Sequence, residues 1–329
     1  MSNQTFLKIP TSFLLNSDDD THFNIYIERN DVNCVLYAKP YNFTAKHQEI
    51  LKCNNIEYLY IDNSEQMSYE EYAEINLPKV IQNTKVPNDE KVKIIREHTH
   101  NITSKIFKQT HDEYLTDALQ KQIINLVGYI VDFLITNDNS YESFQKLIST
   151  NYREYIHGLN VSVYGMSLLM AYYNSKNQKL PYKSELKHIG ASMILHDIGK
   201  LKVPNGILYK EARLTRNEFE EIKKHPVYGL ELCQQMNLDN TIINTVFLHH
   251  ERLDGSGYPT QTTNISLTSQ ITGIVDMFDA MTSDRPHRKR KFTTFEALKT
   301  LKHDADKNKI DKQLLKLFIE LVSSNQFSL

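Results

Sequence analysis

The sequence predicts a small α+β module followed by an all-α domain, and two observations lead to this fold class. Residues 6–40 and 58–61 contain short runs in which apolar and polar residues alternate, as in strands. From residue 88 onward, apolar residues recur at helical spacing with few breakers. We therefore expect a small α+β regulatory or sensory module at 1–87, a helical linker region at 88–150, and a helical domain at 151–329.

The N-terminal module is expected to combine strands with two helices. The alternation of residues 23–27 resumes at 34–37 after a polar break, which predicts a hairpin. Residues 44–54 have helical spacing, and residues 58–61 form a short strand that ends at Asp62. Ser68 and Glu71 match a capping box, so a second helix should begin there and stop near Pro78 or continue kinked beyond it.

Helical spacing accounts for most of the remaining chain. The expected helices are 91–108, 111–136, 152–175, 184–198, 216–236, 240–251, 268–283, 293–303 and 311–323. Thr215 and Glu218 form a capping box, which places His225 inside the helix that they open. The apolar stretch 123–135 is too short to span a bilayer and predicts a buried helix. The irregular segment 252–267 is long for a compact helical domain, which indicates a functional loop.

Three histidines of the linker region invite a metal interpretation, namely His98, His100 and His111. They lie in a polar pattern and lack acidic partners at fixed spacing, so we expect them to be exposed helix residues.

Composition limits the partners of the whole chain. The formal net charge of −2 argues against general affinity for DNA, RNA or an anionic membrane, so any anionic ligand must meet a local cluster of cations.

The cysteines and the first residues bear on location. Cys34, Cys53 and Cys233 are scattered and form no CxxC pair, which suggests neither a disulfide framework nor a thiolate metal site. The first residues show no basic stretch followed by an apolar core, so a signal peptide is not expected. A reducing cytoplasm is the expected location.

A histidine and an aspartate stand side by side where an apolar helical stretch ends, in Leu195-His196-Asp197-Ile198-Gly199-Lys200. Adjacent helix residues point about 100° apart, so both side chains can reach one metal only near a helix bend or end. Gly199 is the expected break. A carboxylate beside an imidazole suits a hard divalent or ferrous ion, and the carboxylate can bridge two ions.

More residues of the same types follow at wider spacing. They are His157, His225, His249, His250 and Asp276, each in a segment with helical spacing. A turn-forming loop lies between His250 and Asp276, with the sequence Glu251-Arg252-Leu253-Asp254-Gly255-Ser256-Gly257-Tyr258-Pro259. Over about residues 150–300 the chain resembles the HD-GYP family of phosphodiesterases, a branch of the HD metallohydrolases. The resemblance implies an all-α HD-type fold and a catalytic role for residues 151–329.

The resemblance also implies hydrolysis of the bacterial second messenger cyclic di-GMP to linear pGpG or to GMP. The implied metal ligands are His157, His196, Asp197, His225, His249, His250 and Asp276. Two ions about 3.5 to 4 Å apart can activate water and offset the charge that builds on a phosphodiester. Asp197 would bridge them, with His157, His196 and Asp276 around one ion and the remaining three histidines around the other. This imidazole-rich set suits iron or manganese, with zinc as an alternative, better than magnesium.

Substrate contacts are expected from cations and from the loop. Lys200 lies one turn after His196 and would act with Asp197 in catalysis by pointing toward the phosphate. Arg285 and Arg288 match the family's phosphate-binding positions and suit bidentate contacts. Gly257, Tyr258 and Pro259 would contact the nucleotide, although Tyr258 could instead plug the loop onto the helices.

Some relatives place a glutamate four residues before the first metal histidine, where Arg153 stands here. A guanidinium there would repel a third cation, although Glu154 offers a carboxylate one position later, so we expect two metals and mainly the linear product. The alternative function is a non-catalytic cyclic di-GMP receptor or signalling scaffold. None of the implied metal ligands is lost, which favours an active enzyme over a receptor. A di-iron site could in addition serve as a redox or oxygen sensor that controls the activity. Residues 1–150 could serve a homodimer or a signalling partner.

Overall fold

The computed structural model describes residues 5–29, 33–108, 117–136, 143, 154–284 and 290–323, and the statements below concern these residues. The chain groups into two compact units. Unit 1 comprises Met1–Asn101 and Asp132–Leu147, and unit 2 comprises Ile102–Val131 and Ile148–Leu329. Helices α4 (Asn88–Lys108) and α5 (Asp117–Thr136) therefore contribute residues to both units. The division of the sequence after residues 87 and 150 stays a prediction.

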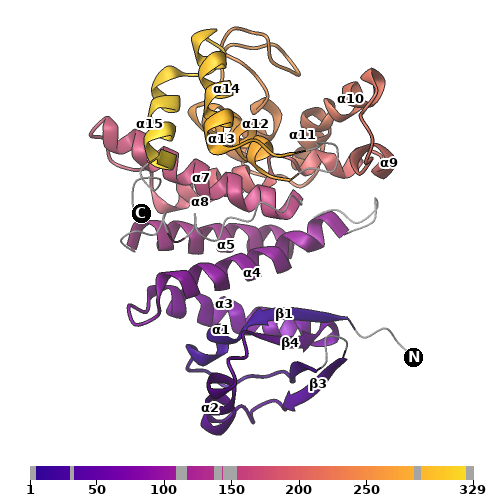
Figure 1. Ribbon diagram of the computed structural model, residues 1–329, viewed down its shortest axis with the longest axis vertical. Coiled ribbons are helices and arrows are strands. Elements are labelled where there is room, and N and C mark those ends of the chain that lie inside the picture. The colour runs from indigo at the N-terminus through magenta and orange to yellow at the C-terminus, as the bar shows by residue number, and fades with distance from the viewer. Residues whose placement is uncertain are drawn as a thin grey trace. The chain divides into compact units, whose positions relative to one another are not determined.

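Unit 1 is built on a four-stranded antiparallel sheet with the strand order β1-β4-β2-β3 (Figure 1). The strands are β1 (Phe6–Pro10), β2 (Ile25–Arg29), β3 (Asn33–Ala38) and β4 (Tyr58–Asp62). The expected hairpin is confirmed as β2 and β3. Alternate side chains of β4 point to opposite faces of the sheet, so Leu59 and Ile61 are fully buried while their neighbours are partly exposed. The helices of unit 1 include α1 (Thr11–Leu15), α2 (Ala45–Cys53) and α3 (Gln66–Gln82).

An aromatic cluster anchors α3 in the core of unit 1. Phe13 and Phe23 each meet Tyr69 and Tyr72 edge to face, with ring centroids 5.4 Å apart at the closest pair. All four residues are buried. Edge-to-face pairs add to the free energy gained by burial, so this cluster ties α1 and the segment before β2 to α3.

Two sequence-based expectations for unit 1 are wrong, and the first concerns the start of α3. Helix α3 begins at Gln66, so Ser68 lies inside it and caps nothing. The side chain of Asp62 accepts from the Ser64 amide and opens a short 3₁₀ helix that leads directly into α3. Of the two outcomes expected at Pro78, the helix takes the second and continues beyond the proline to Gln82.

The second wrong expectation concerns His98, which is 8% exposed and packs edge-on near Tyr69 with ring centroids 6.5 Å apart. Tertiary packing buries His98, although the residues around it in the sequence form a polar pattern. Among the described residues, no group of three metal-ligating side chains includes His98 or His100. His111 lies outside the described residues.

Unit 2 is helical, which confirms the expected order of an α+β module followed by an all-α domain. Its helices after residue 153 are α7 (Glu154–Ser175), α8 (Lys183–Leu195), α9 (Asn205–Leu208), α10 (Arg216–Ile222), α11 (His225–Gln235), α12 (Asn240–Leu248), α13 (Leu267–Thr282), α14 (Thr294–Asp306) and α15 (Lys312–Ser323). The apolar stretch at 123–135 is confirmed as a buried segment of α5. No described helix is both long and apolar enough to cross a membrane.

Helix α7 lies at the centre of unit 2, where it packs on α8, α13 and α15 (Figure 1). Helix α12 packs on α8, α11 and α13. The expected helix at 216–236 is in fact two helices. The capping box of Thr215 and Glu218 is present and opens α10, but α10 ends at Ile222, and α11 begins at His225. Pro226 explains why a new helix begins at His225, because proline is tolerated in the first turn of a helix but not in its interior.

Candidate metal centre

The neighbouring His196 and Asp197 stand at a helix end, as the sequence predicts. Helix α8 ends at Leu195, four residues earlier than the expected break at Gly199, and a 3₁₀ helix, η2 (Ile198–Lys202), follows. Residues three apart are aligned in a 3₁₀ helix, so Lys200 lies over Asp197 and its Nζ is 2.6 Å from Asp197 Oδ2. The glycine has another purpose. A Cβ on Gly199 would lie 1.8 Å from the carbonyl oxygen of His225, so only glycine lets α11 approach this closely.

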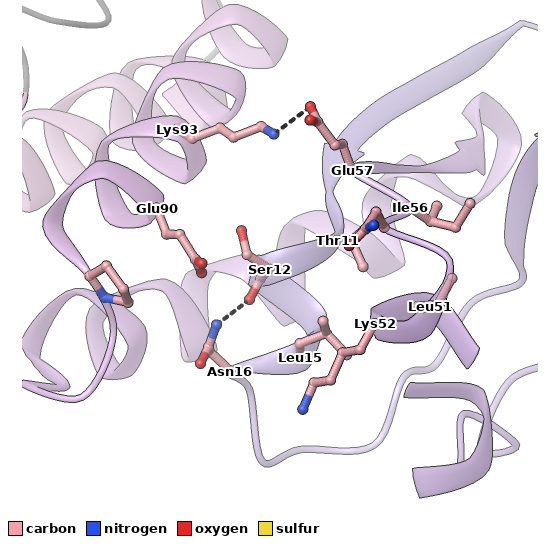
Figure 2. A pocket seen from close by; sticks show the side chains of 12 residues that line it. Thr11, Ser12, Leu15, Asn16, Leu51, Lys52, Ile56, Glu57, Glu90 and Lys93 are labelled. Atoms are coloured by element: carbon pink, nitrogen blue, oxygen red, sulfur yellow. Dashed lines mark hydrogen bonds and ion pairs between the residues drawn. The ribbon is translucent and has the colours of Figure 1, made fainter. Parts of the chain in front are cut away.

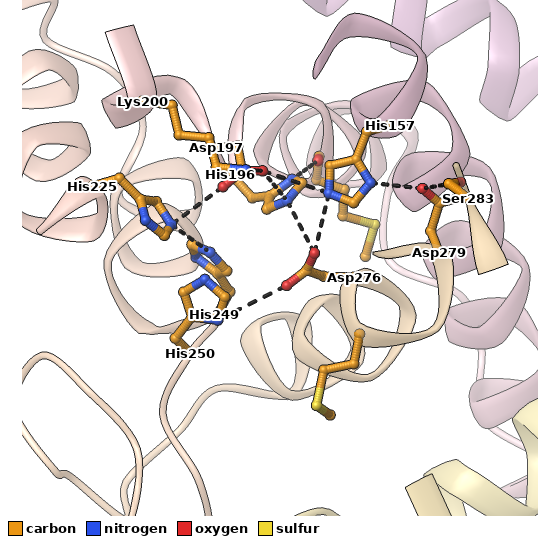
Figure 3. Close-up of polar contacts among 12 residues, drawn as sticks. His157, His196, Asp197, Lys200, His225, His249, His250, Asp276, Asp279 and Ser283 are labelled. Atoms are coloured by element: carbon orange, nitrogen blue, oxygen red, sulfur yellow. Dashed lines mark hydrogen bonds and ion pairs between the residues drawn. The ribbon is translucent and has the colours of Figure 1, made fainter. Parts of the chain in front are cut away.

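Seven side chains converge in unit 2 from α7, the ends of α8 and α12, the start of α11, and α13 (Figure 3). Asp197 lies between two groups of histidines, with Oδ2 3.3 Å from His196 Nε2 and Oδ1 3.2 Å from His225 Nε2. Asp276 lies 3.1 Å from His157 Nε2 through Oδ1. The side chains form three overlapping groups, and within each group the potential ligand atoms all lie within 4.8 Å of one another. The groups are Asp197, His225, His249 and His250; His157, His196 and Asp197; and His196, His249 and Asp276.

The proton positions on four of these histidines follow from their hydrogen bonds. Nδ1 of His196, His225 and His249 faces the carbonyl oxygens of Met193, Ile222 and Val246, at 2.8, 2.8 and 2.9 Å. A carbonyl oxygen only accepts, so each Nδ1 must carry the proton. Nδ1 of His157 lies 2.7 Å from a carboxylate oxygen of Asp279 and donates in the same way. Each Nε2 is therefore turned toward the centre, where a neutral ring would offer its lone pair, an orientation typical of metal-binding histidines.

Two contacts show that a cation fits here. Nε2 of His225 and Nε2 of His249 are only 3.3 Å apart, and in the neutral rings both atoms offer a lone pair. Two lone pairs at this separation repel each other unless a proton or a metal ion lies between them. Nε2 of His196 is buried and makes no hydrogen bond of good geometry among the described residues, although Oδ2 of Asp197 lies 3.3 Å away. Burying such an atom costs free energy unless it binds something, so the donor set fits a divalent metal.

The electrostatics of the centre separate two kinds of histidine. Burial lowers the pKa of His225 to about 4 and that of His249 to about 3, so both rings are neutral at pH 7, the form in which an imidazole can bind a metal. Burial acts against ionisation of His196 as well, but Asp197 and Asp276 outweigh it and raise the pKa of His196 to about 10. Burial would raise the pKa of Asp197, but Lys200 and His196 hold it well below its usual range. The two carboxylates are thus ionised and attract positive charge into a buried site.

Sequence reasoning missed the residues that support the candidate metal-binding side chains. Asp279 is buried, and its carboxylate accepts hydrogen bonds from Asn160 Nδ2 at 2.8 Å and Ser283 Oγ at 3.3 Å, besides its contact with His157. A signal exists in retrospect, because Asp279 lies three residues after Asp276 and therefore on the same face of α13. It was overlooked because an aspartate in a helix is usually a solvated surface residue.

The loop after α12 closes back on the histidines. The ring of Tyr258 stacks on His250 with centroids 4.7 Å apart, and Lys223 Nζ lies 5.1 Å from the centroid of the Tyr258 ring. A Cβ on Gly257 would lie 2.4 Å from the Cα of Glu251, so this glycine permits a close backbone approach. Tyr258 and Pro259 are joined by a cis peptide bond. The predicted phosphate contacts Arg285 and Arg288 lie outside the described residues.

Comparison with known proteins bears on this centre. A family profile described as an HD domain matches residues 146–314, which is about half of the chain. The chain belongs to the HD domain family. This match spans all seven converging side chains, so the histidines and aspartates belong to the HD domain and not to the N-terminal unit.

Two relatives of the HD domain are named as phosphodiesterases. The chain is 30% identical over 204 residues to a cyclic di-GMP phosphodiesterase of Pseudomonas aeruginosa, covering 60% of this chain and 46% of that protein. It is 40% identical over 133 residues to the cyclic di-GMP phosphodiesterase PdeB of Borreliella burgdorferi, covering 40% of this chain and 35% of that protein. The chain thus spans less than half the length of either relative. These matches confirm the resemblance to the HD-GYP family.

A solved structure resembles the chain over almost its whole length. Bd1817, described as an HDG"Y"P protein from Bdellovibrio bacteriovorus, aligns with a TM-score of 0.66 and 20% identity over 97% of this chain and 100% of that one. At this identity the likeness shows a shared fold. It extends to unit 1, so the HD domain and the small N-terminal sheet occur together in both proteins.

Proposed function

We propose that this chain is a metal-dependent phosphodiesterase that hydrolyses cyclic di-GMP to the linear dinucleotide pGpG and, after a second cleavage, to GMP. One observation carries the proposal: five histidines and two aspartates converge in a buried centre, and four of the histidines are oriented by hydrogen bonds at Nδ1. Such a donor set holds two divalent ions. The two relatives named as cyclic di-GMP phosphodiesterases supply the substrate class.

The two ions would divide the ligands around Asp197. His157, His196 and Asp276 would hold one ion, and His225, His249 and His250 the other, with one oxygen of Asp197 toward each group. Iron or manganese suits this imidazole-rich set, and zinc is the alternative. When bound, the ions would supply Lewis acidity and an activated water.

The protein's own groups would place and neutralise the substrate. Hydrolysis adds water across one phosphodiester P–O bond, so negative charge grows on the phosphate oxygens in the transition state. Lys200, whose Nζ already contacts Asp197, would donate to a phosphate oxygen and offset this charge. Arg285 and Arg288 would bind the phosphates by forked hydrogen bonds. Gly257, Tyr258 and Pro259 would border the nucleotide at the loop.

The number of metals affects the product. Arg153 occupies the position from which some relatives recruit a third ion, and it lies outside the described residues, as does the side chain of Glu154. We expect two ions and mainly linear pGpG, because a second cleavage would depend on the fuller cluster. A cytoplasmic location is part of the proposal, as is a role of residues 1–150 in homodimerisation or in binding a signalling partner.

The alternative is a receptor or scaffold that binds cyclic di-GMP without turnover. An inactive descendant is expected to have lost a ligand of the centre, whereas all seven side chains are present and converge here. The deciding experiment purifies the full chain without oxygen, measures bound metals, and follows cyclic di-GMP by chromatography. Formation of pGpG, lost in an Asp197→Ala variant, is the expected result. Tight binding of cyclic di-GMP without any product from metal-loaded protein would establish the receptor instead.

A further inference from the structure

Arg252 follows the paired histidines and has unusual partners for a half-buried cation. Its Nη1 donates to the carbonyl oxygens of His249 at 3.2 Å and of Glu251 at 2.7 Å, and its Nη2 lies 3.2 Å from Met277 Sδ. These partners are backbone carbonyls and a thioether. One terminal nitrogen of the guanidinium thus holds both backbone carbonyls while the other reaches Met277, so the group that could grip a phosphate is used on the chain's own atoms.

The two carbonyls belong to the turn that carries the metal-binding histidines. Helix α12 ends at Leu248, and the last carbonyls of a helix lack partners within the helix. A cation at this end is favourable because it also meets the negative end of the helix dipole. By holding the carbonyls on both sides of His250, Arg252 restricts the backbone rotation that would swing the imidazoles of His249 and His250 away from the centre.

Arg252 also connects this turn to α13, which carries Asp276. A Cβ on Gly273 would lie 2.5 Å from the His249 carbonyl oxygen and 3.4 Å from Arg252 Nη1, so α13 approaches the turn closely at this glycine. Asp276 follows Gly273 by about one helical turn, and Met277 is the next residue. One guanidinium therefore spans the two segments from which His249, His250 and Asp276 reach the centre.

We propose that Arg252 is a positioning residue that sets the geometry of His249 and His250 relative to Asp276, and thereby the affinity for the metal ion that these histidines hold. The inference rests on the proposed metal centre and not on the substrate or the reaction. A supporting group beyond the ligands themselves is worth about 10- to 100-fold in metal affinity. Lysine cannot reproduce the effect in full, because a single ammonium group lacks the planar fork.

The test is a titration of metal-free protein with Mn²⁺, in which free Mn²⁺ is followed by electron paramagnetic resonance. We expect Arg252→Ala to weaken one of the bound Mn²⁺ ions by about 10- to 100-fold and Arg252→Lys to weaken it less. Millimolar guanidinium ion should restore affinity in Arg252→Ala, because it can occupy the space left by the side chain. Arg290→Ala is the matched control, since Arg290 is exposed and pairs with Glu296.

Several results would overturn the inference. A folded Arg252→Ala protein with wild-type Mn²⁺ affinities would show that Arg252 only stabilises the fold. Unchanged Mn²⁺ binding with a raised KM for cyclic di-GMP would make Arg252 a substrate contact. If Arg252→Ala did not fold, wild-type affinity in Arg252→Lys would refute the inference equally. Wild-type protein that binds no Mn²⁺ would refute the metal centre itself, whereas wild-type protein that binds Mn²⁺ without phosphodiesterase activity would leave the inference supported and reject only the reaction.

Discussion

Replacing Gly199 by alanine should damage both the stability and the metal centre of the HD domain. The added Cβ would lie 1.8 Å from the carbonyl oxygen of His225 and 2.4 Å from the amide nitrogen of Gly229. Real Cβ atoms essentially never come within 3.0 Å of such atoms, so η2 and α11 must move apart by at least about 1.2 Å. Both atoms belong to the backbone, so no side-chain rotation can relieve the contact.

The size of the effect follows from this geometry. Overpacking a core costs about 1 to 3 kcal/mol, and a clash between two backbones belongs at the upper end. For a unit of this size, about 3 kcal/mol corresponds to a fall in Tm of about 6 to 12 °C. The same displacement would pull His225 away from Asp197, now 3.2 Å apart, by more than the roughly 0.5 Å that a functional site tolerates. Metal content should therefore fall as well.

Gly206→Ala is the matched control, because a Cβ at Gly206 meets no atom within 4 Å. In helix α9 this substitution should be neutral or stabilising by up to about 1 kcal/mol. The assay compares Tm by circular dichroism and bound metal by mass spectrometry in wild type and both variants. If Gly199→Ala melted and bound metal like Gly206→Ala, the close approach of η2 and α11 would not be needed to build the centre.

Four further predictions concern the centre, its substrate and α10. Asp197→Ala should lose bound metal and turnover, because the two oxygens of this carboxylate face the two histidine groups; normal metal content by mass spectrometry would contradict the bridging assignment. Tyr258→Ala should weaken cyclic di-GMP binding by about 5- to 150-fold in calorimetry if the ring stacks on guanine, while unchanged affinity would leave it the role of packing on His250. Arg285→Ala should lower kcat/KM by about 10- to 150-fold, the equivalent of about 1.5 to 3 kcal/mol, with full metal content; loss of metal would instead make the residue structural. The hydrogen bond from Lys210 and the backbone amide of Thr215 lower the pKa of Glu218 to about 2 from its usual 4.5, so its stabilising effect is present above pH 4.5 and is lost as pH falls toward 2. Glu218→Gln should accordingly lower Tm at pH 7, and a deficit that persisted unchanged near pH 2 would exclude this electrostatic origin.

Local patterns predicted much of the fold. The hairpin, the second capping box, most helices and the irregular loop depend on interactions between residues close in sequence, and the structure confirms them. The same locality explains the errors. Whether Ser68 or Asp62 opens the turn before α3, and whether His98 is covered, depends on what packs there and not on the neighbouring residues.

The sequence by itself determined which residue types stand at which positions of the candidate site, and their spacing indicated the HD-GYP family. It could not show what holds them. The proton on Nδ1 of His225 is placed by a carbonyl of Ile222, that of His157 by Asp279 from another helix, and the turn of His249 by Arg252. Gly199 was expected to break a helix and instead permits two backbones to meet. Such relations are decided by tertiary structure, because metal-ligand chemistry is a property of each side chain, whereas its orientation is set by atoms that only packing brings within about 3 Å.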